Sequence, residues 1–183
     1  MKRIFLVALV MLLLPTVASA QWNVQPGYRS FYDLGVGIGT GDESKTNFEV
    51  STSQGYQLVP TYFYIGTGAA FQAFFNADGA CGFPVFVNLR RHFSPGKVSP
   101  FVDVRVGYAS VTGDYYDNGG FYLCPTLGIR FAINNNFGIN LRAGYTWENA
   151  RLGGYVCYYP ESFGCKGPRK NIGGANIQIG IDF

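Results

Sequence analysis

The chain ends in the run Asn176-Ile177-Gln178-Ile179-Gly180-Ile181-Asp182-Phe183, in which apolar residues alternate with polar or small ones. Successive side chains of a β-strand point to opposite faces, so this run predicts a strand with one apolar and one polar face. A soluble domain rarely ends abruptly inside such a strand, on an aromatic residue. The upstream sequence decides whether the apolar face meets a protein core or lipid.

The same alternation recurs upstream and predicts eight strands in all. Each is roughly 10–13 residues long, close to the 9–11 that a tilted transmembrane strand needs and longer than the 5–6 typical of soluble sheets. The expected strands are 31–40, 48–58, 61–74, 83–93, 100–110, 120–132, 137–148 and 172–183.

The connections between these strands alternate between long and short. The long ones are Gly41–Asn47, 76–80, Val111–Gly119 and Asn149–Asn171, and the short ones lie near 59–60, 94–97 and 133–136. Short turns on one side and longer loops on the other are typical of a transmembrane barrel. The sequence therefore predicts an all-β fold. Specifically, we expect an eight-stranded antiparallel up-and-down transmembrane β-barrel with a polar lumen, short periplasmic turns and longer extracellular loops.

The polar faces of the expected strands carry charges of both signs, which can pair inside a narrow lumen. Small residues such as Gly35, Gly144 and Gly180 share these faces, where space is tight. An eight-stranded barrel has room only for its own side chains, so the bulky apolar faces are expected to meet lipid. The expected lumen charge network consists of Asp33, Glu49, Arg90, Asp103, Arg105, Arg130, Arg142, Glu148 and Asp182.

Three positions depart from this pattern. Arg91 is the one charged residue on an outward face, and it lies near a short turn. Pro125 removes a ladder hydrogen bond inside its strand, so we expect a bulge or a broken register there. The third strand alternates poorly beyond Ala69, which leaves its faces open.

Residues 1–20 have the features of a cleaved secretory signal peptide, which leaves 21–183 as the barrel domain. Lys2 and Arg3 precede the apolar stretch Ile4–Leu14, and Ala18-Ser19-Ala20 is a small-residue cleavage site. The apolar stretch is shorter than the roughly 20 residues of a membrane-spanning helix, although an uncleaved anchor is the alternative. Without Lys2 and Arg3 the net charge falls from +3 to +1. Nucleic-acid binding needs a cluster of basic residues, and the sequence does not indicate one.

The four cysteines are Cys81, Cys124, Cys157 and Cys165. An exported chain meets oxidising conditions, which permit disulfides, and four cysteines allow three pairings. Cys157 and Cys165 share one expected loop and are the favoured pair. The chain has no CxxC motif and a single histidine, so no metal site or cofactor is expected.

The chain resembles the small outer-membrane β-barrel family that includes the OmpA transmembrane domain and OmpX. The matching features are the Ala18-Ser19-Ala20 site, the strand at 99–108, the run Gly119-Gly120-Phe121-Tyr122 and the final Phe183, and the likeness covers 21–183. The resemblance implies an integral protein of the Gram-negative outer membrane. It also implies that the barrel-assembly machinery reads a terminal signal formed by Ile177, Ile179, Ile181 and Phe183.

Such barrels host adhesins, enzymes, channels and structural proteins, so the fold does not name the activity. His92 is the only imidazole, and it lies beside Ser94 and Ser99 near a short turn, away from surface substrates. We therefore expect no catalysis. The last loop combines aromatic and cationic residues that suit contact with partners or acidic sugars. The candidate contact residues are Arg151, Tyr155, Tyr158, Tyr159, Lys166 and Arg169.

The leading hypothesis is a non-enzymatic integral outer-membrane barrel with a structural or surface-interaction role through its loops. One alternative is a narrow passive channel for ions or small solutes. Another is a soluble periplasmic barrel that binds a ligand inside, as lipocalins do, with its apolar face inward. The expected partners are outer-membrane lipid, the assembly machinery and an unnamed surface ligand. A closed barrel has no free edges, which favours a monomer.

Overall fold

The computed structural model describes residues 26–41, 44–58, 62–75, 77, 79–113, 116–117, 119–134, 136–152 and 169–183. These residues form strands joined by turns and loops, and no helix occurs among them. Within this part of the chain, no helix is long and apolar enough to cross a membrane.

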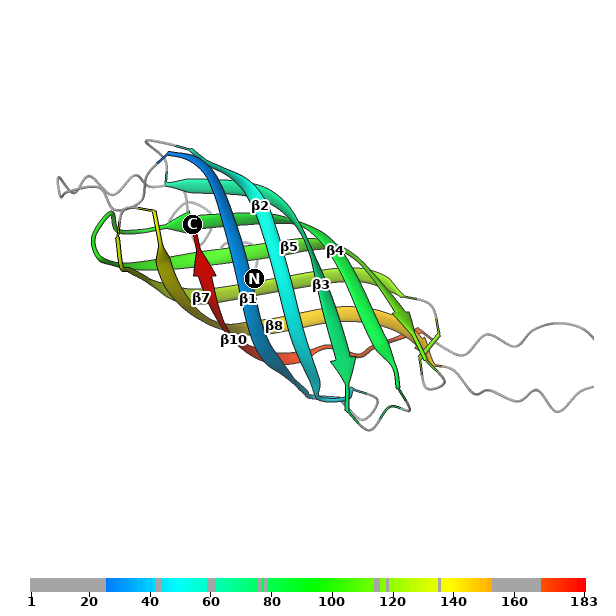
Figure 1. Cartoon of the computed structure of the whole chain (residues 1–183). Helices are drawn as coiled ribbons and strands as arrows, with labels where there is room; N and C mark the ends of the chain where they lie inside the picture. The colour runs from blue at the N-terminus through cyan, green and yellow to red at the C-terminus, as the bar shows by residue number, and fades with distance from the viewer. Residues whose placement is uncertain are drawn as a thin grey trace, which may run out of the picture.

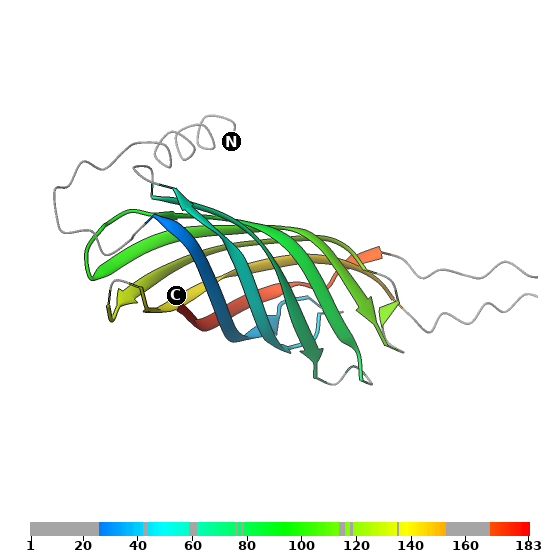
Figure 2. The same ribbon diagram turned by 45° about the horizontal axis from the view of Figure 1, so that its top comes forward.

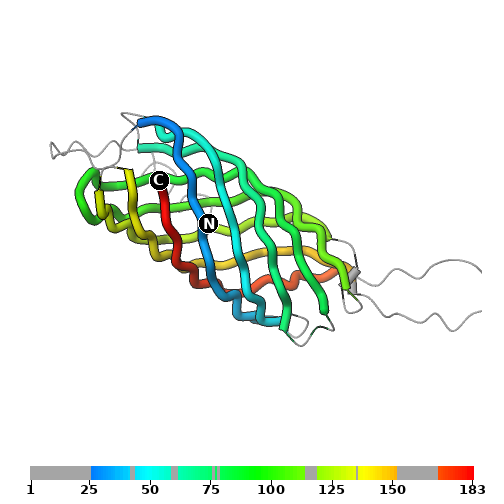
Figure 3. Tube along the Cα trace, viewed as in Figure 1, coloured from blue at the N-terminus to red at the C-terminus, as the bar shows by residue number. Residues whose placement is uncertain are grey.

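Eight strands build one closed barrel (Figure 1). Every neighbouring pair is antiparallel, and β10 pairs with both β8 and β1, which closes the sheet. The red β10 lies beside the blue β1 in the tube view (Figure 3). This closed, antiparallel, eight-stranded architecture confirms the fold predicted from the sequence. The barrel strands are β1 (Gly27–Gly39), β2 (Asn47–Leu58), β3 (Phe63–Phe74), β4 (Cys81–His92), β5 (Val98–Thr112), β7 (Gly120–Ala132), β8 (Gly138–Leu152) and β10 (Gly174–Asp182).

Two further strands lie where the sequence predicted only loops. β6 (Tyr116–Asp117) and β9 (Arg169–Asn171) both pair with the end of β8, which runs to Leu152 rather than stopping at 148. Below this extension, Ala150 and Ile172 are buried in a small apolar cluster with Phe74, Ala77, Ala80 and Val111. This cluster gives β8 an apolar contact beyond residue 148, which explains why the strand continues.

Pro125 interrupts the pairing of β7 with β8 without shifting the register. β7 keeps one register with β8, from Leu123 opposite Trp147 to Thr126 opposite Gly144, and only the pairs at Cys124 and Pro125 are missing. Against β5 the pairing is continuous through Pro125. The predicted bulge or register break at Pro125 was therefore wrong, because a missing N–H removes one ladder bond but adds no residue.

The far end of β3 also alternates regularly. Phe71 is 41% exposed, whereas its neighbours Ala70 and Gln72 and the later Phe74 are buried. Arg91 differs from its expected exposed position, since only 4% of it is accessible. Its guanidinium lies 5.2 Å from the centre of the Phe63 ring, which covers it at the turn end of the barrel.

The outer wall carries a continuous apolar belt, formed by the outward residues of strands that tilt around the barrel (Figure 2). Leu127 is 67% exposed and Ile179 54% exposed in the middle of this belt. At the turn end, the ring of Phe183 contacts Tyr32 at 5.7 Å and Phe137 at 5.8 Å. Toward the loop end, exposed aromatic residues form a second group. An apolar band between two aromatic rims is the surface that a transmembrane barrel presents to lipid.

A lysine in the belt should therefore disfavour insertion, whereas a lysine in a turn should not. We expect Ile179→Lys to cost about 2–4 kcal/mol of stability in lipid, and Ile133→Lys, in the turn after β7, about 0–1 kcal/mol. The measurement is unfolding in lipid vesicles, together with the mobility of unboiled protein on a gel.

The two variants make the same substitution at residues that are 54% and 62% exposed, so exposure alone would predict similar effects. Equal stability of Ile179→Lys and Ile133→Lys would contradict a lipid-facing belt.

Candidate functional site

The structure buries all nine residues of the expected lumen charge network in the barrel interior. Each is 3% exposed or less, and alternation along seven different strands points them inward. The interior also contains buried polar residues that the sequence analysis did not single out, among them Arg29, Asn88, Asn176 and Gln178. Their alternation with outward apolar neighbours is the sequence pattern that could have identified them as inward residues.

The centre of the interior is a continuous set of ion pairs across the barrel. Asp103 lies 2.6 Å from Arg90 and 3.4 Å from Arg142. Asp33 lies 2.7 Å from Arg105 and 3.3 Å from Arg142. Arg142 therefore bridges both aspartates, and each aspartate pairs with more than one arginine.

Aromatic rings fill the space around these arginines. The guanidinium of Arg90 lies 4.0 Å from the ring centre of Phe31 and 4.3 Å from that of Phe101. The guanidinium of Arg105 lies 4.7 Å from the ring centre of Phe86. Cation–π contacts of this kind strengthen when desolvated, to about 2 kcal/mol each. The sequence pattern predicted bulky apolar residues on the outside, so these inward rings were not expected.

The two ends of the interior carry different charges. At the turn end, Asp182 pairs with Arg130 at 2.7 Å and with Arg29 at 3.2 Å. At the loop end, Glu49 accepts hydrogen bonds from Gln72 and Gln178, and lies 3.7 Å from Arg105. These partners hold Glu49 in a fixed position near the mouth.

Glu148 lies at the same mouth, where the neutral side chain of Gln72 is its hydrogen-bond partner. It is 1% exposed, and among the described residues it is the one inward carboxylate that forms no ion pair. Its Oε1 atom is buried without a hydrogen-bond partner. The turn end thus holds two arginines for one aspartate, whereas the mouth holds an uncompensated carboxylate.

His92 and Ser99 lie closer together than the sequence analysis allowed, but their bonding does not suit nucleophilic catalysis. Nδ1 of His92 is 3.2 Å from Oγ of Ser99, while that hydroxyl donates to the backbone oxygen of Ser94 at 2.6 Å. His92 is 1% exposed and packs on Phe101. A catalytic serine must give its proton to the base and must reach substrate. This pair does neither.

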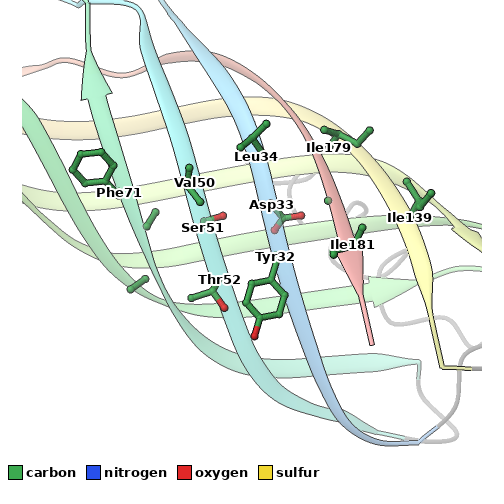
Figure 4. A pocket seen from close by; sticks show the side chains of 13 residues that line it. Tyr32, Asp33, Leu34, Val50, Ser51, Thr52, Phe71, Ile139, Ile179 and Ile181 are labelled. Atoms are coloured by element: carbon green, nitrogen blue, oxygen red, sulfur yellow. The ribbon is translucent and has the colours of Figure 1, made fainter.

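The outer wall has a shallow groove of about 730 Å³ that spans β1, β2, β3, β8 and β10 (Figure 4). Its lining is apolar, with Leu34, Val50, Phe71, Ile139 and Ile179 around the opening. A groove of this kind suits alkyl chains rather than a polar substrate. It belongs to the apolar belt.

The expected contact residues fall partly on the loop-end extension. Arg151 of β8 lies opposite Arg169 of β9 in the register, and Arg169 and the adjacent Lys170 are exposed. Tyr155, Tyr158, Tyr159 and Lys166 lie outside the described residues.

The favoured disulfide between Cys157 and Cys165 also lies outside the described residues. Cys81 and Cys124 are free thiols, and Cys124 is buried beside Asn176 and Thr146. The described residues contain no cluster of three or more His, Cys, Asp or Glu side chains that could hold a metal.

The expected assembly signal forms an outward row. Ile177, Ile179, Ile181 and Phe183 are between 38% and 57% exposed. The backbone of Phe183 exchanges two hydrogen bonds of 3.0 Å with Ser30, so pairing with β1 extends to this residue.

The central ion pairs predict a large effect of removing one charge. We expect Asp103→Asn to destabilise the barrel by about 3–5 kcal/mol, because it leaves Arg90 and Arg142 buried and less compensated. Lys97→Gln, which neutralises an exposed charge in a turn, should stay within about 0.5 kcal/mol of the parent. The measurement is urea unfolding in vesicles, and equal midpoints for the two variants would contradict the network's structural role.

No protein-family model matches the sequence, and no curated protein matches it. Three solved structures are similar to the barrel. Neisserial surface protein A (NspA) has a TM-score of 0.62 and 14% identity, over 85% of this chain and 96% of that chain. The outer membrane enzyme PagL has a TM-score of 0.52 and 15% identity, over 84% of this chain and 98% of that chain.

The outer membrane protein OprG from Pseudomonas aeruginosa has a TM-score of 0.51 and 10% identity, over 89% of this chain and 99% of that chain. At these identities the likeness shows the fold alone. One of the three is named an enzyme and two are not, so the comparisons do not decide catalysis. The chain has the fold of the small eight-stranded outer-membrane barrels, as its sequence predicted.

Proposed function

We propose that this protein is an integral outer-membrane barrel with a closed interior and no catalytic role, which acts through the surface at its loop end. The apolar belt between two aromatic rims supports a membrane location. A soluble ligand-binding barrel would need its apolar face inward. Among the described residues, the interior instead contains five arginines and five carboxylates, so it is charged rather than apolar.

The observation that carries this proposal is the filling of the interior by charged and aromatic side chains. Arg90, Arg105, Arg130 and Arg142 are among the largest fully buried side chains of the barrel. The cavity at the mouth has a volume of only about 10 Å³, roughly the room that one water needs. A barrel filled in this way transmits neither solutes nor substrate, so its function lies on its surfaces.

The proposed interaction uses the surface at the loop end of the barrel. The short strands β6 and β9 lengthen the sheet beyond the barrel. Arg169 of β9 lies opposite Arg151 of β8, and the adjacent Lys170 lies on the other face of the strand. Arg151 also lies opposite Asp117 of β6 in the register, so this arginine has an acidic residue beside it, whereas Arg169 and Lys170 are exposed at the end of the extension. This arrangement supports contact with anionic groups, such as the phosphates of surface sugars.

We further propose that residues 1–20 direct export of the chain and that the barrel-assembly machinery inserts it into the outer membrane. We also propose that the protein is a monomer. The closed β8–β10–β1 pairing leaves no free edge in the barrel wall itself, which supports the monomer. The outward row from Ile177 to Phe183 is the surface that the machinery would read.

A narrow passive channel is the second candidate, because the interior is polar and carries both signs of charge. We expect purified protein in planar bilayers to give no conductance steps, since the central ion pairs occupy the cross-section. Asp103→Asn serves as the control, because it removes one charge from the central ion pairs that fill the interior. Regular steps from the wild-type protein that change in size with this variant would favour the channel.

The basic extension predicts charge-dependent binding at the loop end. We expect Arg169→Ala with Lys170→Ala to weaken binding to phosphate-bearing lipopolysaccharide by about three- to thirty-fold, from two exposed ionic contacts of about 0.3–1 kcal/mol each. Binding should also weaken with added salt. Lys97→Ala, at the opposite end of the barrel, is the matched control. Equal losses from both changes would place the interaction elsewhere.

A further inference from the structure

The mouth of the barrel contains a buried carboxylate that is paired with none of the described cationic side chains. Glu148 is 1% exposed and has no ion pair among the described residues, and its Oε1 atom has no hydrogen-bond partner. A buried, uncompensated carboxylate is strongly disfavoured unless a cation or a proton neutralises it. The hydrogen-bond partner of Glu148, Gln72, is neutral and supplies no compensating charge.

Further oxygen atoms face the same place. The amide nitrogen of Asn176 donates to Thr146 at 2.8 Å and to Cys124 at 3.3 Å, which leaves its Oδ1 atom buried and unpartnered. Oδ1 of Asn47 is also buried without a partner. With the carboxylates of Glu49 and Glu148, these amides give a donor set made only of oxygen.

The four side chains line one small cavity between the end of β1, the start of β2, and the facing parts of β8 and β10. Its volume of about 10 Å³ suits a single water or ion. Glycines create this space: a Cβ added to Gly37 would lie 2.6 Å from Oδ1 of Asn47. Lys45 also borders the cavity and is the nearest competing positive charge on its lining.

We propose that this mouth cavity binds one hard divalent cation, Ca²⁺ or Mg²⁺, between Glu49, Glu148, Asn47 and Asn176. Hard cations prefer carboxylate and amide oxygens, and they supply the charge that Glu148 lacks. The site is formed by the barrel interior alone. The proposal therefore does not depend on the membrane location or on the loop-end surface.

The test is calorimetric titration of CaCl₂, and then MgCl₂, into the refolded full chain in detergent after treatment with a chelator. We expect one saturable site in the wild-type protein, and a loss of affinity of about tenfold or more in Glu148→Gln. Gly37→Ala, which keeps both carboxylates but fills the cavity, should weaken binding in the same direction. Lys45→Ala should tighten it, because a competing charge is removed.

Glu161→Gln is the matched control, since it makes the same chemical change in the last loop. Gel mobility before and after boiling verifies that each variant is folded. A second readout separates binding from folding: Ca²⁺ should raise the melting temperature of the wild-type protein but not of Glu148→Gln. Without metal, Glu148→Gln should be at least as stable as the wild type, because it removes an uncompensated buried charge.

Three results would overturn the proposal. The first is a wild-type protein that shows no saturable heat with either salt, in which case water or a proton occupies the cavity. The second is an affinity that Glu148→Gln and Gly37→Ala leave unchanged. The third is an equal loss in Glu161→Gln, which would indicate adventitious binding by loop carboxylates.

Discussion

Closure of eight strands on themselves is the constraint from which the rest of this structure follows. A barrel of this size encloses a space that side chains must fill, while the outer wall needs an apolar surface if it is to meet lipid. Both demands fall on the same strands, so each strand must alternate strictly. Arg105 and Asp103 therefore lie inside while Val104, between them, points out, and no residue on β5 can change faces without a shift of the whole strand.

Filling the interior with charge brings a second constraint, because a buried charge is tolerated only when its partners are in place. Arg142 shows how the barrel meets it. Its guanidinium reaches Asp33 of β1 and Asp103 of β5, and it also donates to Gln178 of β10. One side chain on β8 thus ties together three other strands. The ion pairs therefore connect strands across an interior in which charged side chains are packed among aromatic rings.

The separation of inward polar faces from outward apolar faces explains what the sequence could predict. Period-two alternation identifies strands and faces, because each side chain's direction is a local property. Asp33, Arg105 and Asp182 were therefore assigned inward from their neighbours alone. Which charges would pair was not accessible, since Arg105 and Asp33 lie 72 residues apart and meet only through the register of several strands. The inward rings of Phe31, Phe86 and Phe101 were missed because size was taken to imply the outer face.

The loop end was predicted less well, for a different physical reason. The lengths of the connections indicated where the loops lie, but β6 and β9 pair with an extension of β8 whose Ala150 is buried with Ile172 in a cluster distant in sequence. Tertiary contacts rather than local pattern stabilise such short strands. The spaces beside glycines also depend on tertiary contacts, because the side chains of neighbouring strands determine whether such a space stays open.

The distribution of charge along the barrel axis follows from these contacts and sets the character of its two ends. Inward arginines and carboxylates are equal in number, yet Asp182 faces two arginines at the turn end while Glu148 faces none at the mouth. The interior is therefore neutral as a whole and polarised along its length. An arginine at the mouth would have paired Glu148, but it would also have filled the cavity that Gly37 and Gly174 leave open. Small residues and an unpaired carboxylate at one position leave both the room and the charge for a cation, which is the arrangement that a binding site requires and a purely structural core does not.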